Sequence, residues 1–170
     1  EEIGHVHKEY EVGYDQFHQS ESYIYFYLLC MANPAHEQNV ERARRFAGFF
    51  LNEDPEAINY DPEKKILLCA HNGSKGPRWL YQDTDEPSYG YSPGMAVYGL
   101  PYDDLEGIDS VEDLKDPANA QRMGQAMKER MAKGDVATNL HVCSLIVNAF
   151  LMTGDEKYKR WLLEYVDAWM

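Results

Sequence analysis

The chain has 170 residues, and its 16 basic against 29 acidic residues give a formal net charge of −13. A surface of this sign repels nucleic-acid phosphates and anionic lipid headgroups, so we expect neither nucleic acid nor membrane as a partner. The longest apolar run, residues 23–31, falls short of the roughly 18 residues that span a bilayer. The length suits a single domain, which we predict over residues 1–170.

The first helical hairpin is predicted over residues 15–51. Its first helix ends at Ala32, and the apolar run 23–31 leaves that helix no polar face, so we expect it to be buried on all sides. Pro34 breaks it, because proline cannot continue the helical hydrogen bonds. The second helix, 37–51, combines an apolar stripe with a charged face, so we expect it to be amphipathic.

Residues 52–109 are predicted to form a loop-rich insertion. They contain six prolines and many Gly, Asn, Asp and Tyr residues, and only 66–70 has the pattern of a short strand. A long irregular segment in a compact domain is usually functional or disordered, and the Tyr and Trp content argues against disorder. We therefore expect this insertion to contribute to a cleft.

A further helix is predicted from Pro117 to Lys133. Asp116 has the character of an N-cap, and proline fits the first helical position, where an N–H would be unsatisfied anyway. Gly134 follows the helix and can adopt the left-handed conformation that ends one. The spacing of Ser110 and the acidic residue three positions later predicts a capped helical turn upstream.

The second hairpin, residues 135–170, repeats the first. Asp135 is expected to begin a helix that is apolar on all sides over 140–151, and Asp155 to cap an amphipathic helix after it. Alternating all-apolar and amphipathic helices favour a two-layer ring over a simple bundle. We predict an all-α fold, an (α/α) toroid of helical hairpins; two hairpins cannot close a ring, so we expect a fragment of a longer chain.

The three cysteines, Cys30, Cys69 and Cys143, are far apart in the sequence and belong to no CxxC or His/Cys cluster. We therefore predict no disulfide framework, no metal site and no cofactor. A signal peptide upstream of the chain would make the protein periplasmic or extracellular, and without one it would be cytoplasmic.

Several stretches carry a family resemblance. They are residues 15–21, 45–48, 52–55, 59–62, 71–77 and 134–140. Together they resemble the six-hairpin-glycosidase-like (α/α) toroid proteins of bacterial polysaccharide utilisation. This resemblance implies a glycoside hydrolase or polysaccharide lyase that acts on a polysaccharide or oligosaccharide, including uronate-containing ones. It also implies a cleft at one end of the ring, built from the starts of the inner helices and their loops.

The first inner-helix start offers three candidate residues. Asp15 and His18 share one helical face, and Glu21 lies one step aside. A histidine near a carboxylate can exchange protons near neutral pH, so we predict His18 and Glu21 as catalytic and Asp15 as substrate-binding. In the alternative interpretation, Asp15 caps the helix and His18 is partly exposed.

The second inner-helix start offers Asp135 as a catalytic carboxylate and Asn139 as a ligand for sugar hydroxyls. A buried amide in an apolar helix needs hydrogen-bond partners, whereas Asp135 would also suit a plain N-cap. A hydrolase would need two carboxyl groups on either side of the bond, for example Glu21 with Asp83 or Asp135.

The loop after residue 70 adds a titratable ring, an amide and two cations. We predict His71 as catalytic, and Asn72, Lys75 and Arg78 as substrate-binding, because the cations could pair with a uronate carboxylate. Tyr89 could stack on a sugar or serve as the base of a lyase. Turn formation alone would also explain this loop.

The alternative function is a non-catalytic helical-repeat binding protein that presents residues 52–109 to a partner. The two functions differ in one structural expectation: an enzyme of this kind should bring His18, His71 and Asn139 together.

Overall fold

The computed structural model of the chain describes residues 16–74, 76–77, 100–131 and 133–170. Five α-helices carry most of this structure: α2 (Gln16–Ala32), α3 (Glu37–Gly48), α4 (Pro117–Met131), α5 (Val142–Thr153) and α6 (Glu156–Trp169). Three 3-10 helices accompany them: η2 (Tyr102–Asp104), η3 (Val111–Lys115) and η4 (Ala137–His141). The predicted all-α class is confirmed, and the small β element is an antiparallel pair, β1 (Tyr60–Asp61) with β2 (Ile66–Leu67).

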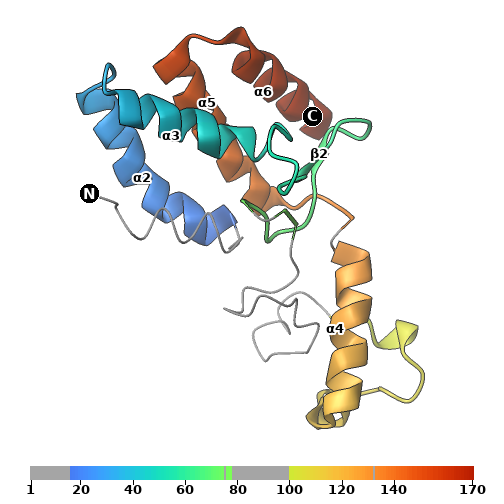
Figure 1. The fold of residues 1–170 in the computed structure, drawn as a ribbon. Helices are drawn as coiled ribbons and strands as arrows, with labels where there is room; N and C mark the ends of the chain where they lie inside the picture. The colour runs from blue at the N-terminus through green and yellow to red at the C-terminus, as the bar shows by residue number, and fades with distance from the viewer. Residues whose placement is uncertain (1–15, 75, 78–99, 132) are drawn as a thin grey trace.

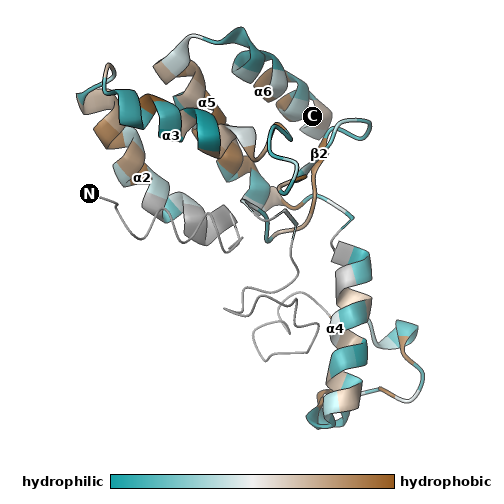
Figure 2. Cartoon of the chain, in the orientation of Figure 1, coloured by the Kyte–Doolittle hydropathy of each residue, from teal (hydrophilic) through white to brown (hydrophobic). Residues whose placement is uncertain are grey.

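Four of the helices form one layered body (Figure 1). Helices α2 and α5 begin at the same end of this body and run the same way, and α3 and α6 return in the opposite direction. Helix α5 is central, because it packs against α2, α3 and α6. Figure 2 shows the chemical difference between the layers: α2 and α5 are largely apolar, whereas α3 and α6 alternate apolar and polar residues.

Aromatic side chains fill much of the core of this body. Phe26 of α2 meets Phe46 of α3 edge to face, with ring centroids 5.5 Å apart. Trp161 and Tyr165 of α6 stack at 5.0 Å, and Tyr60 of β1 packs on Trp161 at the same distance. These rings join α2 to α3 and the β-hairpin to α6, since such contacts add to the free energy of burial.

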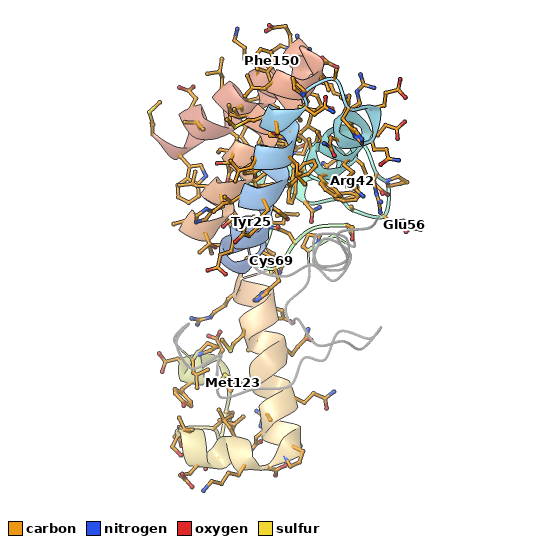
Figure 3. All side chains as sticks on the ribbon, turned by 90° about the vertical axis from the view of Figure 1, so that its left-hand side faces the viewer. Tyr25, Arg42, Glu56, Cys69, Met123 and Phe150 are labelled. Atoms are coloured by element: carbon orange, nitrogen blue, oxygen red, sulfur yellow. The ribbon has the colours of Figure 1, made fainter. Side chains whose placement is uncertain are left out.

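The all-round burial predicted for α2 and α5 is wrong. Tyr25 and Met31 of α2 are 71% and 72% exposed, and Leu151 of α5 is 71% exposed. Figure 3 shows the Tyr25 side chain on the outside of α2. The reason is geometric: the helices that pack on α2 and α5 leave one side of each helix uncovered by the described residues.

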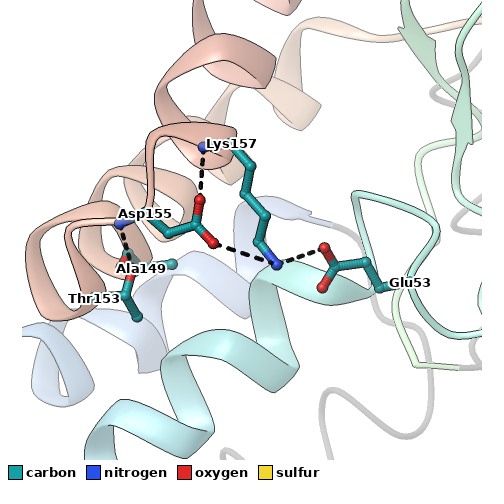
Figure 4. Close-up of polar contacts among 5 residues, drawn as sticks. All are labelled: Glu53, Ala149, Thr153, Asp155 and Lys157. Atoms are coloured by element: carbon teal, nitrogen blue, oxygen red, sulfur yellow. Dashed lines mark hydrogen bonds and ion pairs between the residues drawn. The ribbon is translucent and has the colours of Figure 1, made fainter.

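The start of the second helix pair also differs from the prediction. Asp135 does not cap an α-helix, because η4 comes first and α5 begins only at Val142. Gly134 lacks the predicted left-handed backbone, whereas Gly154 has it, with φ 66° at the end of α5. Asp155 caps α6 as predicted by accepting a hydrogen bond from the backbone N–H of Lys157 at 2.9 Å (Figure 4).

Helix α4 extends away from the layered body (Figure 1). It begins as predicted, with the Asp116 carboxylate accepting a hydrogen bond from the Ala118 N–H at 2.9 Å and with Pro117 in the first helical position. Met123 and Met127 of α4 are buried in a second, smaller hydrophobic cluster that includes Cys69. Cys69 comes from the loop after β2, so this loop connects the two cores.

The core can be tested with a matched pair of isoleucines. Ile146 of α5 is fully buried, whereas Ile58 is 47% exposed. Replacing Ile146 with Ala should lower the free energy of unfolding by about 2–5 kcal/mol, because it removes buried methylenes and leaves a cavity. The control Ile58→Ala should lower it by about 1 kcal/mol or less, because truncating a half-exposed side chain leaves no enclosed cavity. Urea denaturation measures both; equal losses would contradict the described packing.

Candidate functional site

Three segments that are distant in the sequence meet where α2 and α5 begin. Helix α2 packs against η4, which leads directly into α5. The loop after β2 joins them, since the Cys69 N–H donates to the Gly134 carbonyl at 3.0 Å. Figure 3 shows Cys69 near the end of the layered body from which α4 departs. The predicted inner-helix starts and the loop of His71 therefore share one end of the body.

The Asp135 carboxylate connects these segments. One oxygen accepts hydrogen bonds from the Leu67 N–H at 2.7 Å and the Tyr165 hydroxyl at 3.0 Å. The other accepts from the Val136 N–H at 2.8 Å and the Asn139 amide at 2.7 Å. These four donors match the four lone-pair positions of a carboxylate, so Asp135 is fully engaged in joining β2, η4 and α6.

Asn72 and Asn139 form a buried amide pair beside Asp135. The Asn72 Nδ2 donates to the Asn139 Oδ1 at 3.2 Å, and both amides also donate to the Cys69 carbonyl, at 3.0 and 2.9 Å respectively. Both side chains are fully buried. Burying two amides is costly unless they are hydrogen-bonded, and here each is bonded within the protein.

The loop after β2, which carries His71 and Asn72, has an unusual backbone conformation. Cys69 has φ 64°, in the left-handed region that non-glycine residues rarely adopt. Asn59 stabilises the far end of the loop, because its amide donates to the Gly73 carbonyl at 2.7 Å and accepts from the Gly73 N–H at 3.1 Å. His71 lies between these fixed points and is 2% exposed. His71 is thus a buried residue on a loop whose backbone is hydrogen-bonded at both ends.

The structure groups some predicted site residues and leaves others outside its described part. His71, Asn72, Asp135 and Asn139 belong to the one junction. Glu21 lies on α2 with an exposed side chain, and His18 lies in the first two turns of α2, where only its helical backbone is described. The remaining predicted residues fall outside the described ranges: Asp15, Lys75, Arg78, Asp83 and Tyr89.

Two residues of the junction were not expected there from the sequence. The sequence predicts only an amphipathic helix after Asp155, yet the hydroxyl of Tyr165 in that helix reaches Asp135. Asn59 was part of a motif without an assigned role, yet its side chain also donates to the Phe49 carbonyl at 2.8 Å. A buried tyrosine usually needs a partner for its hydroxyl, which is the signal that could have identified Tyr165.

Within the described ranges, no three His, Cys, Asp or Glu side chains are grouped as a metal ion would require. No helix in the same ranges is both long and apolar enough to cross a bilayer.

The fold and the junction define an all-α protein in which two parallel helices begin at a shared polar end. Residues 1–170 match the family DUF8034, a domain of unknown function, and the chain belongs to this family. No curated protein and no solved structure matches the chain.

Replacing Asp135 with Asn tests the junction, because the new amide hydrogens must face at least one of the present donors. We expect a loss of about 1–3 kcal/mol in the free energy of unfolding, as for a buried donor left without an acceptor. The exposed Asp109 serves as control, and Asp109→Asn should change little. A double-mutant cycle with Tyr165→Phe should give a coupling energy of about 0.5 kcal/mol or more, and strict additivity would contradict the described contact.

A pH titration of stability tests Tyr165 independently. Burial first, and then the charge of Asp135, raise the pKa of this phenol above its usual range. The unfolded chain therefore releases the Tyr165 proton near pH 10, while the folded chain retains it. The contribution of Tyr165 to the free energy of unfolding is fully present below pH 10 and falls above it. Tyr165→Phe should lessen this fall by about 1.4 kcal/mol per pH unit between about pH 10.5 and 11.5. Guanidinium denaturation at each pH measures the slope; unchanged alkaline slopes would refute the prediction.

Proposed function

We propose that the chain is part of an (α/α) toroid and acts on carbohydrate, as a glycoside hydrolase or polysaccharide lyase. One observation carries the proposal: the two predicted inner-helix starts and the loop of His71 meet at one end of the helical layer. Asn72 and Asn139 are joined by a hydrogen bond although 67 positions separate them in the sequence. A toroid enzyme would have its cleft at this end.

The hydrogen bonds indicate which residues hold the proposed site in place and which transfer protons. Asp135, Asn72 and Asn139 bond mainly within the protein, which suits the rigid base of a site. Among the proposed carboxylates, Glu21 is exposed, whereas Asp135 already accepts four hydrogen bonds. Proton transfer therefore falls to Glu21 and to the histidines His18 and His71. The hydrogen-bonded Asp135 and the 2% exposed His71 both need a local rearrangement to reach a substrate.

The open apolar faces of α2 and α5 favour a second candidate, a helical-repeat protein that binds another protein without catalysis. Met31 of α2 and Leu151 of α5 are 72% and 71% exposed and line one groove, and a contiguous apolar surface of this kind marks an interaction site.

The reaction class can be decided with a panel of neutral and uronate-containing polysaccharides. A lyase should produce unsaturated ends that absorb in the ultraviolet, and a hydrolase should produce reducing ends without that absorbance. Release of neither product from any member of the panel would count against both enzymes and favour the binding protein.

Given activity on one polysaccharide, His71→Gln tests the site. Because general acid–base catalysis contributes about 100-fold or more to rate, we expect kcat to fall by about that factor. His36→Gln is the matched control, since His36 is exposed in the turn between α2 and α3. Circular dichroism and thermal melting check that both variants are folded. Full activity of a folded His71→Gln variant would remove His71 from the site.

A further inference from the structure

An open apolar groove lies over α5, with the end of α2 on one wall and α6 on the other. Its volume is about 550 Å³, and its lining includes Met31, Val147, Leu151, Leu162, Leu163 and Val166. None of the ten lining residues carries a charge, although the chain as a whole has a formal net charge of −13. Leu151 and Leu163 are 71% and 61% exposed. A contiguous apolar surface of this kind marks a place where another apolar element packs.

The first helix pair shows what fills such a groove. Helix α3 packs against α5, and Ala43 and Ala47 of α3 are fully buried. When the first residues of α3 and α6, Glu37 and Glu156, are aligned, these two alanines correspond to Leu162 and Val166. The α6 residues at these positions are only partly buried, and they line the groove.

We propose that the groove binds the uncharged first helix of a further helical hairpin, which packs against α6 as α5 packs against α3. The chemistry of the occupant follows from the lining, because an unpaired charge buried there would be costly. Helix α5 itself is an example of such a segment, since Val142–Thr153 contains no charged residue. The inference depends on the repetition of the helix pairs and not on carbohydrate chemistry.

The occupant is a hairpin from outside residues 1–170 and not a second copy of them. A second copy would bring another formal charge of −13 against a surface of the same sign. Seating its apolar α2 in the groove would also be a head-to-tail contact, which generates rings or open filaments and not a closed pair.

Photo-crosslinking tests the proposal. A photoreactive amino acid replaces Leu163 in the protein as it is naturally produced, and mass spectrometry identifies the crosslinked peptide. Val111 on η3 is the control position, since it is 52% exposed and apart from the groove. We expect crosslinks from position 163 to an uncharged helical segment that precedes an amphipathic one. Crosslinks to a second copy, to residues 1–170 of the same chain, or at the control level would overturn the proposal.

Leu151→Glu provides the second measurement. Because Leu151 is largely exposed, this variant should fold, and an unchanged circular dichroism spectrum would show that it does. A carboxylate in the contact should reduce the crosslink yield at position 163 by about tenfold or more, equivalent to about 1.4 kcal/mol. Val111→Glu should leave the yield unchanged. An undiminished yield in Leu151→Glu would overturn the proposal, whatever the outcome of the polysaccharide assays.

Discussion

The arrangement of the described residues depends on one carboxylate. Asp135 accepts hydrogen bonds from Leu67 on β2, from Val136 and Asn139 around η4, and from Tyr165 on α6. These four hydrogen bonds join the β-hairpin, η4 and α6 through the single Asp135 carboxylate. Since charged acceptors form stronger hydrogen bonds than neutral ones, a carboxylate is well suited to holding three elements at once.

This junction also determines what the loop after β2 can do. The Asn72–Asn139 pair and the left-handed Cys69 fix the loop from one side, and Asn59 fixes Gly73 from the other. His71 is carried between these points with little backbone freedom. Ordering the backbone of a loop costs conformational entropy, and the hydrogen bonds of the junction offset that cost.

The sequence predicted the helices well because their signals are local. Pro34, Asp116 and Asp155 mark helix boundaries through their own chemistry, and the structure places the boundaries there. Burial is a tertiary property, and the apolar run of α2 could not reveal that its neighbours cover only one side. The role of Asp135 was missed for a related reason: N-capping is a local pattern, whereas its actual donors Leu67 and Tyr165 are distant in the sequence.

The junction and the groove are connected through the direction of the helices. Helices α2 and α5 run in parallel, so their starts lie at one end (Figure 1). The hydrogen bonds of Asn72, Asp135 and Asn139 lie at the start of α5. A further hairpin seated on α5 and α6 in the same manner would bring the start of its first helix to that same end. Each added pair would therefore extend both the apolar core and the polar end. In a repeat of this geometry, closing the exposed face and completing a site are consequences of the same packing step.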